Sequence, residues 1–406
     1  MDQMVKQNLL VILGNGFDVS CNLPSGYVDF FRNDFNALNF DNDELKRKMI
    51  NWLLKYIDVE ESGSNETLHK YILTELGKSK DLLKENQKIS DLNLNDWDLL
   101  FLYAYFFTQN DKWNFVESII EMTVEAVSSS KKKNYEKYRS LFDNNSDMYL
   151  MIIVAKLLFN KDDKDLNNMF AQLNKFEQKF SNYINKKVSD SESENSEKET
   201  YKEKAINTLK KIIGSEEQFQ NINIVSFNYS LDARFTKDFK EKTNLTINSW
   251  NNIHGVAAAS DSTQWSSLKA ILKARNNNIQ FKNVPPKIIF GINSVGIGGT
   301  DSRYKFTKEY RKKNSDNDQV NTVNELVDGK LPSVLNKVIF FGHSLSEADH
   351  YELRKLLKRR VKDDTQFVIY IYDRNKTKDD EFKKNLEEIL YNTEAKNIKH
   401  LSLKDS

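Results

Sequence analysis

The sequence has few of the residues that shape turn-rich or disulfide-bonded proteins. Its 406 residues include 13 glycines, 4 prolines and a single cysteine, Cys21. So little glycine and proline disfavours a turn-dense all-β fold and favours long helices. One cysteine excludes an intramolecular disulfide framework and any cysteine-rich zinc cluster within this chain.

Long apolar runs and an excess of charge are lacking as well. The longest apolar runs, Leu99–Phe107 and Tyr149–Ala155, fall well short of the roughly 20 residues that a bilayer crossing needs. Residues Met1–Leu13 do not have the pattern of a signal peptide. Sixty basic residues oppose 59 acidic ones, which leaves a net charge of +1. We therefore expect a cytoplasmic protein, and the charge balance argues for neither a membrane nor a nucleic-acid partner.

Five short runs of aliphatic and aromatic residues predict buried strands. Near-continuous apolar runs are typical of parallel strands that are covered on both faces. A helical stretch, Ala348–Val361, follows the fourth run, and this alternation predicts an α/β fold with a Rossmann-like parallel sheet. The runs are Leu9–Leu13, Ile222–Phe227, Lys287–Phe290, Lys337–Phe341 and Phe367–Tyr372.

The sequence between the first two strands has a helical pattern instead. Residues from about Asp34 to Ile213 contain no proline and no clear strand, and a run rich in serine, glutamate and lysine at 187–204 predicts a mobile charged loop. We therefore predict a Rossmann-like nucleotide-binding domain made of residues 1–33 and 215–406, with a helical insert at 34–214. Apolar residues recur at three- and four-residue spacing in Leu45–Ile57, Val116–Val127, Leu150–Phe159 and Met169–Ile184.

An aromatic-rich segment, Trp97–Phe107, lies within this predicted insert. It is interpreted as the core of the insert. The alternative is a lid, a partner surface or the sensor of a signal.

The sharpest local motif, Gly14-Asn15-Gly16-Phe17-Asp18, ends the first predicted strand. Glycines at such a point let the backbone approach a phosphate, with amides and a following helix terminus as donors. The third glycine of the dinucleotide fingerprint is missing, because position 19 is Val19. A simple strand-ending turn therefore stays open as an alternative.

Four more clusters of polar residues and glycine follow predicted strands. Ligands of open α/β sheets bind beyond the carboxyl ends of the strands. Each cluster alone fits an ordinary turn, but five at equivalent positions of one sheet predict a binding site. The four are Ser226–Tyr229, Asn252–Gly255, Phe290–Asn293 and Phe341–Leu345.

Two of the five histidines, His254 and His343, belong to these clusters. His69 and His400 are interpreted as surface residues and His350 as part of a helix start. No pair of histidines or carboxylates around the clusters has the spacing of metal ligands, so we expect no metal.

The order of these motifs resembles the bacteriophage abortive infection AbiH family along nearly the whole chain. This resemblance implies a bacterial defence protein that halts or kills an infected cell. It is carried by Gly14–Asp18, Leu23–Tyr27 with Phe30, Trp113-Asn114 with Glu117, Phe227–Tyr229, Ile253–Gly255, Ile289–Ile292, and Phe341–Leu345 with Asp349.

The same clusters are more distantly similar to sirtuin-like NAD-binding domains, which implies binding and cleavage of NAD. The sequence departs from that pattern at Asn15 and Asp18, which replace an alanine and a serine, and at Ser230, which replaces an aspartate. Asp18 is expected to reach a ribose hydroxyl or a neighbouring backbone amide. The four-cysteine zinc module of the deacetylases is absent, so NAD hydrolysis is favoured over protein deacetylation.

The resemblances imply catalytic roles for Asn228 and His254. They imply a nucleotide ligand, NAD, and they allow a phage-derived trigger, a partner defence protein or a homo-oligomer. A nucleotide-sensing regulator without catalysis is the first alternative, and a nuclease-type effector is the second. The expected cofactor-binding residues are Gly14, Asn15, Gly16, Phe17, Asp18, Tyr229, Gly291, Gly342, His343, Ser344 and Asp349.

Overall fold

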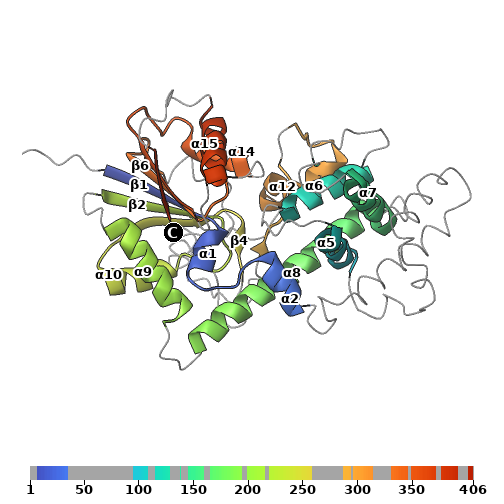
Figure 1. Cartoon of the computed structure of the whole chain (residues 1–406), viewed down its shortest axis with the longest axis horizontal. Helices are drawn as coiled ribbons and strands as arrows, with labels where there is room; N and C mark the ends of the chain where they lie inside the picture. Colours follow the sequence, from blue (N-terminus) through green and yellow to red (C-terminus); the bar gives the residue numbers. More distant parts are fainter. Residues whose placement is uncertain are drawn as a thin grey trace, which may run out of the picture. The chain divides into compact units, whose positions relative to one another are not determined.

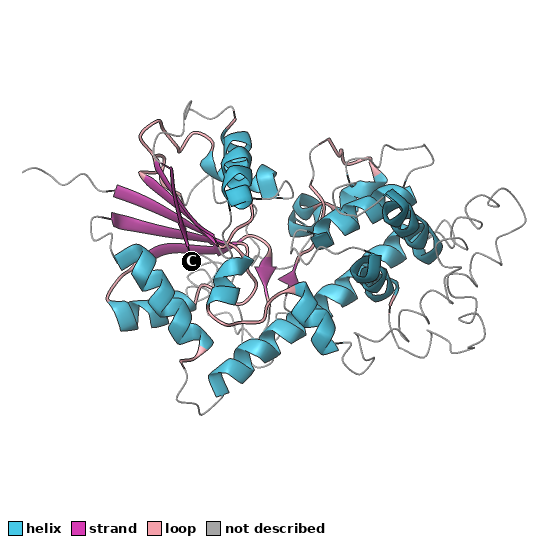
Figure 2. Ribbon diagram, viewed as in Figure 1, coloured by secondary structure: helices cyan, strands magenta, loops and turns pink. Residues whose placement is uncertain are grey.

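The computed structural model of the chain describes residues 7–34, 95–107, 115–128, 138, 145–159, 165–193, 199–214, 219–257, 287–293, 296–313, 331–345, 349–371, 376–391 and 401–405. Its strands and helices are drawn in Figure 1 and Figure 2. The strands are β1 (Gln7–Leu13), β2 (Phe219–Ser226), β3 (Ile247–Asn252), β4 (Gly255–Val256), β5 (Lys287–Ile288), β6 (Lys337–Phe341), β7 (Gln366–Ile371) and β8 (Leu401–Asp405). The helices are α1 (Asn15–Ser20), α2 (Tyr27–Asp34), α5 (Asp96–Phe107), α6 (Phe115–Ser128), α7 (Asn145–Phe159), α8 (Asp165–Ser193), α9 (Tyr201–Gly214), α10 (Phe235–Thr243), α12 (Lys308–Lys313), α14 (His350–Leu357) and α15 (Lys376–Leu390), with the 3₁₀ helix η5 (Ser302–Phe306).

Six of the described strands form one sheet in the order β3-β2-β1-β6-β7-β8. Every neighbouring pair in it runs parallel. This order is that of doubly wound Rossmann-like sheets, in which the chain steps outward from a central strand in both directions. The predicted α/β class and parallel sheet are confirmed.

Four of the five predicted strands belong to this sheet, as β1, β2, β6 and β7. The fifth prediction, a parallel strand at Lys287–Phe290, is wrong. Only Lys287 and Ile288 form a strand, β5, and it pairs antiparallel with β4 in a separate small sheet. Side chains take the place of a strand partner at Phe290, whose amide donates to the Glu177 carboxylate and whose carbonyl accepts from Arg311.

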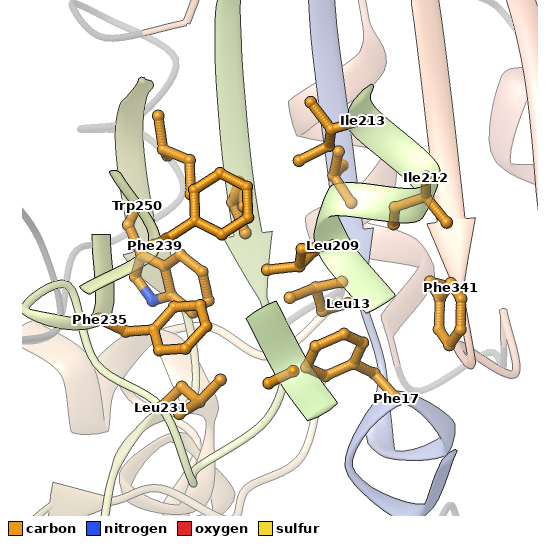
Figure 3. Close-up of a cluster of buried hydrophobic side chains, with 14 of the residues drawn as sticks. Leu13, Phe17, Leu209, Ile212, Ile213, Leu231, Phe235, Phe239, Trp250 and Phe341 are labelled. Atoms are coloured by element: carbon orange, nitrogen blue, oxygen red, sulfur yellow. The ribbon is translucent and has the colours of Figure 1, made fainter. Parts of the chain in front are cut away.

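Alternate residues of β1 face two separate cores, because successive side chains of a strand point to opposite faces of the sheet. Leu9, Val11 and Leu13 pack with side chains of α1, α9 and α10, a cluster drawn in Figure 3. Leu10 and Ile12 pack with those of α14 and α15. Figure 1 shows α9 and α10 on one face of the sheet and α14 and α15 on the other. Burial on both sides explains why the strand is an unbroken apolar run.

The strand order reverses between β1 and β6, which end side by side at Leu13 and Phe341. The chain leaves β1 into α1 and leaves β6 toward α14. The crevice outside the carboxyl ends of two such strands is where open α/β sheets bind ligands. The fold therefore places the loops Gly14–Gly16 and Gly342–Leu345 at the switch point of the sheet.

Three glycines let these two loops touch backbone to backbone. A Cβ atom built on Gly16 would lie 2.7 Å from Cα of Gly342, and one on Gly14 would lie 2.4 Å from Cα of His343. Gly342 itself has a φ of +61°, which L side chains rarely adopt. Hydrogen bonds of 2.9 Å join the amide of Gly14 to the carbonyl of Phe341 and the amide of Gly16 to the carbonyl of Gly342. The glycines are therefore needed for packing of one loop against the other.

The chain divides into two compact units. The first comprises Met1–Gly26, Glu177–Ile297 and Thr307–Ser406, and the second comprises Tyr27–Phe176 and Gly298–Phe306. This division differs from the predicted boundaries, because the last part of α8 and all of α9 group with the sheet. The segment Gly298–Phe306 groups with the helices of the second unit.

Aromatic side chains pack together inside the second unit. The Phe101 ring lies 4.6 Å from that of Phe176 and 5.8 Å from that of Trp97, and Phe31 contacts Phe101 as well. The Trp97 indole donates a 2.8 Å hydrogen bond to the Met169 carbonyl. Trp97 and Phe101 are therefore core residues of this unit, as the interpretation of the aromatic segment as a core predicts.

The predicted helices at Val116–Val127, Leu150–Phe159 and Met169–Ile184 are present within α6, α7 and α8. Leu45–Ile57 lies outside the described residues. In the part of the chain that the structure describes, no helix is both long and apolar enough to span a membrane.

The predicted mobile loop at 187–204 is helical over much of its length. Helix α8 continues to Ser193, and α9 begins at Tyr201. Two apolar anchors within this polar run explain the difference. Val188 packs against the core of the first unit, and Tyr201 is 2% exposed within it. The charged residues described in α8 and α9 within this run are half-buried or exposed positions of the two helices.

We predict that Gly16→Ala destabilises the protein, because the added methyl group would meet the backbone of Gly342. The expected loss is about 1–3 kcal/mol of unfolding free energy, the usual effect of overpacking. Gly298→Ala is the matched control, since a Cβ there has nothing within 4 Å. Thermal unfolding followed by circular dichroism compares the two variants. Equal melting temperatures would show that the two loops do not touch as described.

Candidate functional site

The backbone amides of the β1–α1 loop are largely used within the protein. The amides of Gly14 and Gly16 bond to the β6 loop, and the amide of Phe17 donates to the Gly14 carbonyl over 2.9 Å. The Phe17 side chain is fully buried, with its ring edge-on to Phe341. The Asn15 side chain accepts a hydrogen bond from the Ser25 hydroxyl. This loop therefore contributes mainly to packing, and Phe17 is a core residue.

The Asp18 carboxylate lies at the centre of a buried hydrogen-bond network. It accepts from the hydroxyls of Tyr201 and Ser230, each over 2.7 Å, and from the Asn228 amide over 3.2 Å. Removal from water raises the pKa of Asp18 to about 6, against the effect of these three donors. The partners described for this carboxylate are side chains and not the backbone amide that was one expectation, whereas its contact with a ribose hydroxyl stays a prediction.

Two hydrogen bonds fix the orientation of the Asn228 side chain. Its amide group donates to the Gly14 carbonyl over 2.9 Å and to the Asp18 carboxylate, so both amide hydrogens are used. The oxygen Oδ1 is left as the atom that can accept a hydrogen bond from a ligand or a water molecule. The Asn252 amide in turn donates to the Asn228 carbonyl, which ties the end of β3 to this residue.

The His343 imidazole is held in one tautomer. Its Nδ1 accepts a 3.0 Å hydrogen bond from the backbone amide of Leu345, so the neutral ring carries its proton on Nε2. That Nε2 is buried without a hydrogen bond and lies 3.7 Å from Oδ2 of Asp349. Leu345 itself has a left-handed φ of 54°, which is uncommon for a residue other than glycine.

His254, which lies just beyond the end of β3, faces the same Asp349 carboxylate. It follows β3 directly, is 3% exposed, and its Nε2 has no hydrogen-bond partner. This Nε2 lies 3.6 Å from Oδ1 of Asp349. The ring of Phe227 meets both imidazoles edge-to-face, with centroid distances of 5.1 Å to His254 and 4.3 Å to His343. The structure thus brings together His254, His343 and Asp349, which are far apart in the sequence.

A buried lysine completes this group. Lys308 is 2% exposed, and its Nζ lies 3.1 Å from Oδ1 of Asp349. One turn further along α12, Nζ of Lys312 lies 3.6 Å from the Glu352 carboxylate. Each ammonium group therefore has a carboxylate close by, as buried charges require.

Burial keeps both imidazoles neutral. It lowers the pKa of His343 to about 4, with Asp349 acting in the opposite direction and Lys308 adding to the decrease. It lowers the pKa of His254 well below 6.5, and Lys308, Lys312 and His343 lower it further. A neutral imidazole near physiological pH can accept a proton. Of the two, His254 is the candidate base, because Nδ1 of His343 already accepts the Leu345 amide.

The remaining predicted residues have different surroundings. The Tyr229 ring is buried between Phe180 and Phe290. Gly291 is buried directly after Phe290, whereas the Ser344 side chain is exposed. His350 hydrogen-bonds the Leu345 carbonyl. His69 and His400 lie outside the described residues.

Sequence reasoning missed three residues of this site. Asn252 belongs to a predicted cluster, but nothing marked its side chain as the link to Asn228. Tyr201 lies in the polar run at 187–204, where a single aromatic residue was the only signal. Lys308 is one of many lysines and has no local signature. Each acquires its role through a contact distant in sequence.

Carboxylate, imidazole and ammonium groups converge here, but not as a metal centre. Among the described residues, no group of three or more histidine, cysteine, aspartate or glutamate side chains is placed to hold a metal ion. The nitrogen of Lys308 lies against Asp349, where a cation would otherwise bind. The arrangement can hold hydrogen-bonding ligands and accept a proton.

Comparison with known proteins found no match to a family, to a curated protein or to a solved structure.

Proposed function

We propose that this chain binds NAD and hydrolyses it to nicotinamide and ADP-ribose, as a cytoplasmic effector of abortive infection in bacteria. The sequence resemblance to the AbiH family supports the biological role. The resemblance to sirtuin-like domains supports NAD as the ligand. The strand order supports a nucleotide at the switch point, where doubly wound sheets bind such ligands.

One observation carries the proposal: unused hydrogen-bonding atoms are present at the carboxyl edge of the sheet. Nε2 of His254 and Nε2 of His343 are both buried without a hydrogen bond. A buried polar group that lacks a partner is costly to the fold, by about 1–3 kcal/mol. Such groups call for an explanation, and a catalytic role, in which the arrangement tightens when a ligand binds, is one of them.

Hydrolysis of the bond between nicotinamide and ribose suits these residues. The bonding electrons go to the nicotinamide nitrogen, positive charge builds on the ribose, and a water oxygen bonds to the ribose carbon. Asn228 would hold that water or a ribose hydroxyl through Oδ1, since its amide hydrogens already bond to Gly14 and Asp18. His254 would accept the proton that the water loses, as a neutral imidazole can.

Recognition of the phosphates would fall to side chains in this proposal. The amides of Gly14, Gly16 and Phe17 have partners inside the protein. The exposed hydroxyl of Ser344, in the loop after β6, is the expected donor to a phosphate or ribose oxygen of the adenosine half. His343 would border the same part of the site, and Asp349 would lie between His343 and the proposed base His254.

The burial of His254 favours a second candidate function, a regulator that binds the nucleotide without cleaving it. A base at 3% exposure has little access to water before a ligand arrives. Incubation of the purified protein with NAD, NADP and ATP, followed by product analysis, distinguishes the two. Bound but intact nucleotide would favour the regulator.

We predict that His254→Gln abolishes NAD hydrolysis while nucleotide binding persists. Loss of a positioned base typically lowers turnover on the order of 10²–10⁴-fold. Release of nicotinamide measures turnover, and calorimetric titration measures binding. His400→Gln controls for the loss of any histidine. Wild-type turnover in a folded His254→Gln protein would remove this residue from the mechanism.

The pH dependence of hydrolysis is expected to extend further into acid than that of an ordinary histidine base. Because burial and the nearby lysines lower the pKa of His254 below 6.5, the ring stays neutral as the pH falls through 6.5. The acid limb of kcat/KM should therefore have its midpoint below pH 6.5. A midpoint at or above that value would contradict the assignment of His254 as the base.

Ser344→Ala is expected to raise KM for NAD more than it lowers kcat. Loss of one hydrogen bond to the ligand costs about 0.5–1.5 kcal/mol, or more if the acceptor is charged. The exposed side chain makes a folding defect an improbable cause, and melting temperatures check this. A drop in kcat at unchanged KM would instead place Ser344 at the reacting end of the ligand.

A further inference from the structure

The Asp349 carboxylate lies between two imidazoles, with one oxygen directed at each. The distances from Nε2 to oxygen are 3.6 Å for His254 and 3.7 Å for His343. Hydrogen bonds between such atoms measure about 2.7–3.2 Å. Both gaps therefore exceed a hydrogen bond by about half an ångström, a difference that catalytic contacts can close when a ligand binds.

The two rings are held so that they face this carboxylate. The Leu345 amide fixes Nδ1 of His343, and Phe227 packs edge-to-face against both imidazoles. Each Nε2 is buried and has no hydrogen-bond partner. For the Nε2–H of His343, the Asp349 carboxylate is the acceptor close by, at 3.7 Å.

Lys308 holds the same carboxylate in the structure. Its Nζ bonds to Oδ1 over 3.1 Å, the oxygen that also faces His254. An ammonium group and an imidazole thus compete for one atom. The shorter distance belongs to the lysine.

We propose that Asp349 is the positioning carboxylate of the site, which accepts Nε2–H of His254 and of His343 once Lys308 releases Oδ1. With its Nε2 proton held in this way, His254 presents Nδ1 as its basic nitrogen. This inference rests on the proposed NAD hydrolysis for its catalytic consequence. Its structural content, the coupling of Asp349 to both imidazoles, does not depend on any substrate.

The charges around the two imidazoles determine in which direction each substitution should change the histidine pKa values. Asp349 favours the protonated form of His343, whereas Lys308 and His350 oppose it. Lys308, Lys312 and His343 all oppose protonation of His254. Glu352 lies beside Lys312, at 3.6 Å. Removal of Lys308 should therefore raise both histidine pKa values, and removal of the Asp349 charge should lower that of His343.

The experiment uses Asp349→Asn and Lys308→Met in the full chain, with Glu352→Gln as the matched control. Asparagine keeps the size of Asp349 and is equally favoured at the start of a helix, so the variant is expected to fold. Glu352 lies on the same helix and also pairs with a lysine of α12, but no described contact joins it to either imidazole. Nitrogen-15 NMR of the imidazoles reads tautomer and pKa directly, with peaks assigned by His254→Gln and His343→Gln.

We expect Asp349→Asn to lower the pKa of His343 and Lys308→Met to raise the pKa of both histidines, each by about 1 unit or more, as for a neighbouring charge. The asparagine side chain has one acceptor oxygen where aspartate has two, so it can accept the Nε2–H of only one imidazole. The Nε2 signal of the imidazole that loses its acceptor should therefore shift as well. Glu352→Gln leaves Lys312 without its carboxylate, so it should lower the pKa of His254 further and leave that of His343 unchanged. His343 signals that move no more in Asp349→Asn than in Glu352→Gln would overturn the inference.

Kinetic measurements on the same variant provide a second test, which depends on the proposed function. Asp349→Asn is expected to lower kcat for NAD about 10²-fold or more with KM nearly unchanged, because it acts through His254. A rise in KM at constant kcat would make Asp349 a binding residue and overturn the positioning role. If the wild-type protein never cleaves NAD, the proposed function fails, while the NMR result still decides whether Asp349 is coupled to the histidines.

Discussion

The backbone contact between the loops that leave β1 and β6 is the constraint on which the site depends. Two strands of a sheet lie about 4.8 Å apart, and loops that follow them can stay equally close only without side chains between them. Gly14, Gly16 and Gly342 meet this requirement. The Gly14 carbonyl then holds the Asn228 amide, and Gly342 precedes His343 directly. The position of both polar side chains follows from this contact.

The Asp18 carboxylate and the two histidines of the site differ in how many of their possible hydrogen bonds are formed. Asp18 has three side-chain donors, so its network is closed and rigid. His254 and His343 have unmade bonds on Nε2 and face a carboxylate that Lys308 already holds. A closed network fixes structure, whereas an open one keeps groups that can take up a new partner. The fold therefore places an adaptable group of charges next to a fixed one.

The sequence allowed the central strands to be predicted because their burial on both faces requires apolar residues at every position. β1 and β6 are such runs. β3 could not be predicted, since its sequence INSWNN is mostly polar and its asparagines serve side-chain hydrogen bonds such as that of Asn252. The clusters at strand ends were recognisable because turns require glycine and small polar residues. Asn228, His254 and His343 could be named for that reason.

Contacts between distant segments set the limits of such prediction. Nothing near Lys308 in the sequence indicates that its ammonium group bonds to Asp349, 41 residues away. Tyr201 lies in a stretch whose composition is that of a loop, yet it is buried against Asp18 across 183 residues. The glycine motif after β1 has the composition of a phosphate-binding turn, but the β6 loop already occupies the space above it. The composition of the sequence identified the loop after β1, but it could not show that the loop after β6 packs against it.

The hydrogen bond between Asp18 and Ser230 restricts how this protein can evolve. The Ser230 hydroxyl donates to one oxygen of the Asp18 carboxylate over 2.7 Å, so the two side chains are direct partners. Changing Ser230 alone to aspartate would bury two carboxylates against each other. Changing Asp18 alone to serine would remove the acceptor that Tyr201 and Asn228 share. Each of these single changes is expected to destabilise the buried network, so positions 18 and 230 are expected to change only together.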